Sequence, residues 1–96
     1  MKLTLQDRIA ILSIIPDRDD ADTIEMTSEL ALKASLSDEE AAEHIEDDYI
    51  KKESGDLLFE IDITDVEFNF ISEKMKALQE SKSLTKYNVS LYRKFS

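Results

Sequence analysis

The chain of 96 residues contains no cysteine, no tryptophan, one glycine and one proline. Without cysteine there is no disulfide framework, thiolate nucleophile or cysteine-ligated metal, so the fold has to be held by packing and polar contacts. So few glycines and prolines disfavour a turn-rich all-β fold and favour long helices. A chain of this length has room for one core, and we expect a single compact domain over residues 1–96.

The sequence also lacks an apolar run long enough to cross a membrane. Its most hydrophobic segment, residues 9–15, is far shorter than the roughly 20 residues that a spanning helix needs. The segment follows Asp7 and Arg8 and precedes no small-residue cleavage site, which argues against a secretory signal. We expect a soluble cytoplasmic protein without membrane contact.

Positive charge is scarce in the first half of the chain. Between Asp17 and Asp48, thirteen acidic residues stand against only Arg18 and Lys33, while the whole chain carries a net charge of −10. The imbalance is therefore local. A field of one sign repels nucleic acid and acidic membranes and attracts cationic partners. It predicts a protein partner, with a basic surface, and argues against direct binding of nucleic acid.

Three start signals predict helices. Each pairs a hydroxyl residue with an acid three positions later, as in a capping box: Thr4 with Asp7, Ser37 with Glu40, and Thr64 with Glu67. Pro16 ends the first of these helices at or near Ile15. Apolar spacing extends the other two to about Ile45 and Ser81 and adds another helix over residues 21–34. Ser83 is the expected cap of a fifth helix, in which Leu84, Tyr87, Leu91 and Phe95 follow helical spacing. The first helix is apolar on nearly all sides, which predicts a central position.

One segment has the period of a strand. Leu57, Phe59, Ile61 and Ile63 alternate with other residues, and we expect residues 49–52 to pair with this strand across residues 53–56, where Gly55 supplies a positive φ. The predicted fold class is α+β, mostly α, with four to five helices and one two-stranded antiparallel β-hairpin between helices three and four. The expected core comprises Ile9, Leu12, Ile15, Ile24, Leu30, Phe59, Ile61, Phe68, Ile71, Met75, Leu78 and Leu91.

No motif indicates a metal, a cofactor or catalysis. Asp17, Asp19, Asp20 and Asp22 crowd one short segment, but the calcium-loop pattern fails because its sixth residue is Asp22 and its twelfth is Ser28. His44 is the only histidine, and a catalytic role would also need a nucleophile, a pocket or a metal. We interpret it as a surface histidine and expect a non-enzymatic protein without cofactors.

The acids of the second and third predicted helices are the candidate partner-binding residues: Glu29, Glu39, Glu40, Glu43, Glu46, Asp47 and Asp48. Two other functions fit the charge pattern. The basic end of the chain, with Lys82, Lys86, Arg93 and Lys94, could dock on these acids in a second copy, as in a self-associating assembly component. Spaced carboxylates could also imitate DNA and regulate a basic nucleic-acid-binding protein.

The order of elements admits one more architecture. Two helices joined by a short turn and followed by a hairpin correspond to a helix-turn-helix with a wing. The recognition helix of such a domain presents Arg, Lys, Asn or Gln to DNA. Here the third helix presents Glu39, Glu40 and Glu43, so the sequence favours a protein partner even within that architecture.

Three stretches resemble a family of small proteins of unknown function encoded by phages and prophages. They are Leu3-Thr4-Leu5-x-Asp7-Arg8-x-x-x-Leu12-x-x-x-Pro16, Leu36-Ser37-x-Glu39-Glu40 and Leu84-x-x-x-x-Val89-Ser90-Leu91-Tyr92-x-Lys94-Phe95. The glycine-rich middle of those proteins is replaced here by Glu53-Ser54-Gly55-Asp56. The resemblance implies a genetic context, and a host-cytoplasm location, but no mechanism and no functional residue.

Overall fold

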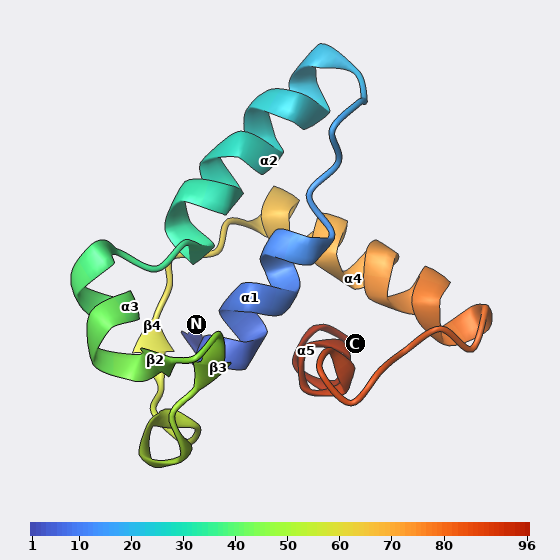
Figure 1. Cartoon of the computed structure of the whole chain (residues 1–96). Coiled ribbons are helices and arrows are strands. Elements are labelled where there is room, and N and C mark those ends of the chain that lie inside the picture. Colours follow the sequence, from blue (N-terminus) through green and yellow to red (C-terminus); the bar gives the residue numbers. More distant parts are fainter.

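The computed structural model describes residues 1–96 and contains five α-helices and four two-residue strands (Figure 1). In chain order the elements are β1 (Lys2–Leu3), α1 (Leu5–Ser13), α2 (Ala21–Ala34), α3 (Asp38–His44), β2 (Ile45–Glu46), β3 (Tyr49–Ile50), the 3₁₀ turn η1 (Lys52–Ser54), β4 (Phe59–Glu60), α4 (Asp65–Glu80) and α5 (Val89–Phe95). The predicted mostly helical α+β class is confirmed. None of the helices combines the length and apolarity that crossing a bilayer requires.

All three predicted capping boxes are formed. Thr4, Ser37 and Thr64 each accept a hydrogen bond from the backbone N–H three residues later, and the acid at that position accepts one from the cap's own N–H. These reciprocal bonds satisfy two of the backbone donors that a helix start leaves open. The starts of α1, α3 and α4 are therefore fixed by local sequence.

Helix α1 lies at the centre of the molecule, with α2, α4 and α5 around it (Figure 1). It packs on both α2 and α5, and α4 packs on α2 and α5 in turn. The fully buried core lies where these helices meet: Leu3, Ala10, Ile11, Leu30, Ala34, Ile71, Met75, Leu91 and Phe95. The predicted core residues Leu30, Ile71, Met75 and Leu91 are confirmed, and Leu12, Ile15, Ile61 and Leu78 pack against them partly buried. Ile24 and Phe59 were also expected in the core but are only half-buried and lie outside this cluster.

Two further expected core residues are wrong. Phe68 remains 36% exposed, although its ring lies 4.9 Å from that of Phe95, measured between centroids. Ile9 is 37% exposed, because α1 turns Ala10 and Ile11 into the core and leaves the Ile9 side uncovered. A helix that is apolar on all sides needs a neighbour on each of them, and α1 lacks one beside Ile9.

The predicted strand pairing is also wrong. Tyr49–Ile50 pairs with Ile45–Glu46 across a two-residue turn, Asp47 and Asp48, whose φ angles of 53° and 66° suit a type I′ hairpin. Gly55 has an ordinary φ of −64° and supplies no left-handed conformation. Aspartate tolerates the left-handed region better than most side chains, and the turn therefore forms without glycine.

The strand β4 pairs with the start of the chain instead. Glu60 lies opposite Lys2 and Phe59 opposite Leu3, and the terminal ammonium of Met1 donates to the Ile61 carbonyl at 2.9 Å. The predicted alternation is confirmed for Phe59, Ile61 and Ile63, which are half-buried while the residues between them are exposed, but it is wrong for Leu57, which is 42% exposed. The hydrophobic period identified the inward face, but the partner strand was set by tertiary packing.

The fifth helix begins later than predicted. The Ser83 side chain bonds only with Ser81, its N–H donates to the Leu78 carbonyl, and α5 starts at Val89. Between them, the Thr85 N–H donates to Asn88 Oδ1 and the Tyr87 N–H donates to Thr85 Oγ1. Side chains that bond to the nearby backbone compete with helical hydrogen bonds, so residues 83–88 form a turn that brings α5 back onto α1.

Candidate functional site

Each capping-box acid is also bonded by a cation from a distant part of the chain. Lys94 of α5 donates to Asp7, Arg8 of α1 donates to Glu40, and Lys33 of α2 donates to Glu67 at 2.8 Å. The acids that start α1, α3 and α4 thus also fasten these helices to α5, α1 and α2. We name these contacts the three cap ion pairs.

Arg8 has the most contacts of the three cations. Its Nη1 and Nη2 bind the two carboxylate oxygens of Glu40 at 2.8 and 3.1 Å, and its Nε and Nη2 donate to the carbonyls of Ala34 and Ser35 at 3.1 and 2.8 Å. Its guanidinium carbon lies 5.1 Å from the centroid of the Phe59 ring. One planar side chain therefore closes the end of α2, holds the start of α3 and contacts β4.

Glu40 is therefore engaged within the molecule, although it was predicted as a partner-binding residue. Its hydrogen bonds from Arg8, and then from the Ser37 N–H, lower the pKa of Glu40 to about 2. Burial is the largest single effect on the pKa values of Asp7 and Glu67 and raises both. The bonds from Lys94 and Lys33, together with the bonds from the N–H groups of Thr4 and Thr64, outweigh it, so both pKa values end up lowered. A carboxylate whose pKa is lowered by folding stabilises the fold while it is ionised.

This linkage predicts how stability depends on pH. The contribution of Glu40 is fully present above its ordinary pKa of 4.5 and is lost as the pH falls toward about 2. The difference in unfolding free energy between the native chain and Glu40→Ala should therefore be constant near neutral pH and shrink below about pH 4.5. Urea titrations of both proteins across this pH range measure the difference in unfolding free energy. The charge repulsion that is common to the two proteins cancels in that difference. A difference that does not change with pH would contradict the Arg8–Glu40 pairing.

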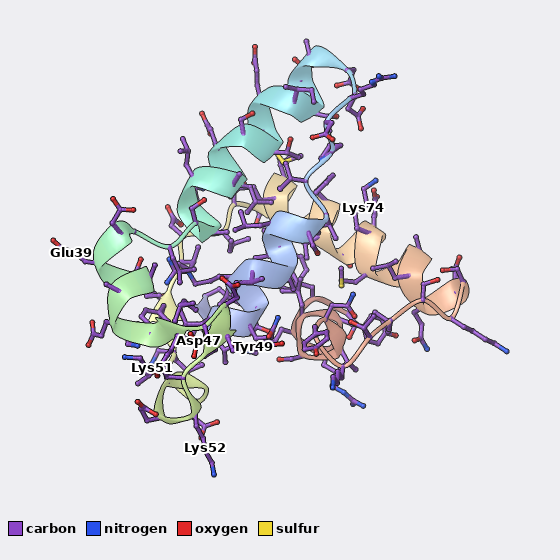
Figure 2. The ribbon with its side chains drawn as sticks, in the orientation of Figure 1. Glu39, Asp47, Tyr49, Lys51, Lys52 and Lys74 are labelled. Atoms are coloured by element: carbon purple, nitrogen blue, oxygen red, sulfur yellow. The ribbon has the colours of Figure 1, made fainter.

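The other predicted partner-binding acids divide into two groups. Glu29 lies on α2 one turn before Lys33, and its charge helps to raise the pKa of Lys33, after the larger effect of Glu67. Five of the predicted acids lie exposed on α3 and the hairpin, and none of them forms an ion pair with a lysine or arginine: Glu39, Glu43, Glu46, Asp47 and Asp48. We call these five the α3–hairpin acids. Figure 2 shows Glu39 at the outer edge of α3 and Asp47 at the hairpin, with Lys51 and Lys52 beyond it.

His44 is buried, and the expectation of a surface histidine is wrong. Its Nδ1 lies 2.7 Å from Ser54 Oγ, its Nε2 lies 3.7 Å from Glu43, and its ring packs edge-on against Phe59. A serine, a histidine and an acid in contact are the parts of a nucleophilic site. However, Ser54 is only 3% exposed and neither it nor His44 lines a pocket, so this contact joins the end of α3 to η1.

The acid-rich segment before α2 forms no metal site. Asp20 caps α2 by accepting from the Thr23 N–H at 2.8 Å, and Asp19 accepts from the Asp20 N–H. No group of three or more His, Asp or Glu side chains is placed to hold a metal ion. Part of the acidic charge in this stretch therefore acts in capping.

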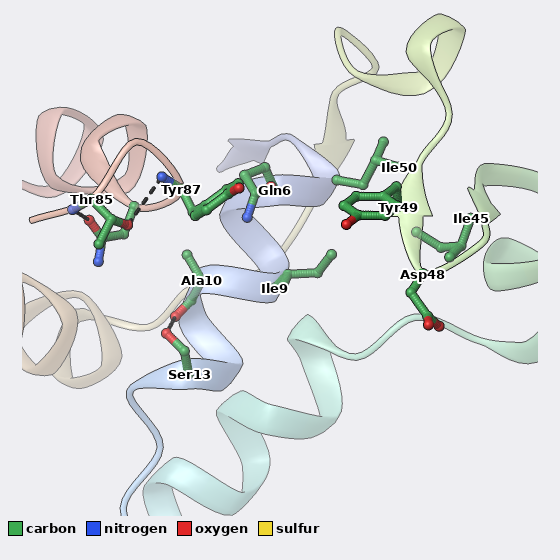
Figure 3. A pocket seen from close by; sticks show the side chains of 11 residues that line it. Gln6, Ile9, Ala10, Ser13, Ile45, Asp48, Tyr49, Ile50, Thr85 and Tyr87 are labelled. Carbon is green, nitrogen blue, oxygen red and sulfur yellow. Dashed lines mark hydrogen bonds between the residues drawn. The ribbon is translucent and has the colours of Figure 1, made fainter.

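The exposed side of α1 forms the floor of a pocket of about 660 Å³, which lies between the hairpin and the loop before α5 (Figure 3). Tyr49 and Ile50 enter it from the hairpin, Ile9 and Ala10 from α1, and Tyr87 from the opposite side. We call this pocket the α1 groove. Its lining residues are Gln6, Ile9, Ala10, Ser13, Ile45, Asp48, Tyr49, Ile50, Thr85, Tyr87 and Asn88.

Three polar side chains in the groove are engaged with nearby groups. Ser13 Oγ donates to the Ala10 carbonyl at 2.6 Å, and Thr85 and Asn88 accept from the backbone of their own turn. The other polar groups of the lining are the side chains of Gln6 and Asp48 and the hydroxyls of Tyr49 and Tyr87. Catalytic and cofactor sites use several convergent polar groups, whereas this groove offers a mostly apolar surface with a carboxylate at one side.

The groove was not predicted from the sequence, because Ile9 was expected in the core and Tyr49 in a longer strand. One signal was present: α1 carries more apolar side chains than a helix with one buried face requires.

No protein-family model, curated protein or solved structure matches this chain.

Proposed function

We propose that this chain is a small non-enzymatic accessory protein of the phage type that binds another protein through the α3–hairpin acids. The phage context comes from the resemblance of Leu3–Pro16 and the two later stretches, and the binding role comes from charge. The observation that carries the role is that these five carboxylates are exposed and have no lysine or arginine partner within the molecule.

Four acids outside this group have structural roles. Asp7, Asp20, Glu40 and Glu67 cap helices, and three of them form the cap ion pairs. The α3–hairpin acids have no comparable contacts, and Asp47 and Asp48 place two like charges side by side in the hairpin turn. Adjacent like charges disfavour folding, so their concentration at one place supports selection for a basic partner.

Self-association through the basic end is less well supported than binding to a different protein. Lys94 is engaged with Asp7, and the ammonium of Lys86 lies 5.2 Å from the centroid of the Tyr87 ring. Lys82, Lys86 and Arg93 are the exposed cations of that end. Imitation of DNA is a special case of the main proposal, in which the basic partner is a nucleic-acid-binding protein.

The proposal is tested by capture from a bacterial lysate on the immobilised chain. The test variant combines Glu39→Gln, Glu43→Gln and Glu46→Gln, and a matched control combines Glu25→Gln, Glu73→Gln and Glu80→Gln, three exposed acids elsewhere. We expect a captured protein whose affinity falls at least tenfold in the test variant and also between about 0.05 M and 0.5 M salt. Equal loss in both variants, or affinity independent of salt, would contradict a role of the α3–hairpin acids.

A further inference from the structure

We propose that the α1 groove is the seat for an amphipathic, basic helical segment of the partner protein, with its apolar side chains on Ile9 and its cations beside the hairpin turn. This inference rests on the proposed function and names the form in which the basic partner is recognised.

The shape and lining of the groove favour an apolar occupant. Its volume of about 660 Å³ lies within the roughly 300–1,000 Å³ of typical binding pockets. Six of its eleven lining residues are hydrophobic, and Tyr49 is 75% exposed beside it. Aromatic side chains with a free polar tip are common anchors at protein interfaces. Covering Ile9 and Tyr49 would remove apolar surface from water at the one uncovered side of α1.

The charges around the groove indicate the sign of the occupant's charge and the direction in which the occupant lies. Asp48 is its only charged lining residue, and Glu46 and Asp47 adjoin it in the hairpin. On the opposite side Lys86 lies against Tyr87. A segment bound along α1 therefore meets carboxylates at the hairpin, where its lysines or arginines would be stabilised, and a cation at the other wall.

A protein segment fits these features better than a small metabolite. The Ser13 Oγ, Thr85 Oγ1 and Asn88 Oδ1 atoms are engaged within the chain, and the floor formed by Ile9 and Ala10 is apolar, so the centre of the groove offers no directional contacts to a small polar molecule. A helix laid in a groove needs none, since it is recognised by apolar anchors at helical spacing and by charges at their flanks. The groove combines an apolar floor with an acidic rim, which matches that mode.

The test uses a designed peptide of leucine and lysine, about two heptads long, with leucines at helical spacing. Two matched peptides have the same composition in a non-amphipathic order, or glutamate in place of lysine. Fluorescence anisotropy with the whole chain measures each dissociation constant. We expect the amphipathic basic peptide to bind at least tenfold more tightly than the reordered one, and the glutamate peptide not to bind.

Neutral variants locate the site without changing the net charge. Tyr49→Ser and Ile9→Asn are expected to weaken binding of the amphipathic peptide at least fivefold, while Leu32→Ser, at a position 79% exposed on α2, should leave it unchanged. Tyr49 is mostly exposed, so its variant tests the groove even if Ile9→Asn impairs folding. Equal binding by the amphipathic and reordered peptides, or by Tyr49→Ser and the native chain, would overturn the inference.

Two outcomes separate this inference from the proposed function. If Tyr49→Ser retains the captured protein while the α3–hairpin variant loses it, the acids bind and the groove does not. If the native chain dimerises in sedimentation and Tyr49→Ser is monomeric, the groove holds a second copy, and the assignment to a partner segment is overturned.

Discussion

Replacing Glu40 with alanine is expected to lower the free energy of unfolding by about 2–3 kcal/mol, because it leaves the Arg8 guanidinium buried without its carboxylate. The Arg8 side chain is only 4% exposed and cannot turn to water, whereas that of Glu40 is 30% exposed. The same change also removes the acceptor of the Ser37 N–H and opens the capping box of α3. Urea denaturation near neutral pH measures the loss.

Glu39→Ala is the matched control, since it removes the same group one residue earlier. Glu39 is exposed and has no ion pair, and we expect its replacement to change stability by less than about 0.5 kcal/mol. Arg8→Met combined with Glu40→Ala should cost less than the sum of the two single changes, because each removes the charge that the other leaves unpaired. Equal effects at positions 39 and 40 would show that the Arg8 contact does not stabilise the fold.

Phe95→Ala is expected to cost about 3–5 kcal/mol, as for other fully buried phenylalanines. The Phe95 side chain is completely buried, contacts the Phe68 ring and belongs to the core shared by α1, α4 and α5. Its removal leaves a cavity and releases α5, whose neighbouring Lys94 holds Asp7 at the start of α1. Urea denaturation followed by circular dichroism measures the change.

Two further variants keep this prediction testable if Phe95→Ala does not fold. Phe95→Leu should cost distinctly less, because it retains most of the buried volume. Tyr87→Ala removes an aromatic ring of similar size from an exposed position in the turn before α5, and we expect a loss of less than about 1 kcal/mol. If Tyr87→Ala and Phe95→Ala cost the same, α5 is not docked as described.

Local signals in the sequence predicted the helices well. The cap residues Thr4, Ser37 and Thr64 start helices where expected, and α2 spans residues 21–34 as predicted. The candidate site could be predicted only in part. Exposure of Glu39 and Glu43 follows from an acidic helix face, but nothing near Glu40 in the sequence identifies Arg8, 32 positions earlier, as its partner.

The sequence by itself determined the starts of α1 to α4, most of the inward faces and the concentration of negative charge, because capping and hydrophobic period act over three or four residues. Only the tertiary structure decided which acids are free, which strands pair and which side of α1 is uncovered. These depend on contacts between distant segments: Arg8 with Glu40, β1 with β4, and α5 with α1. The acids that capping leaves unused and the helix side that packing leaves open are therefore the two features that support binding.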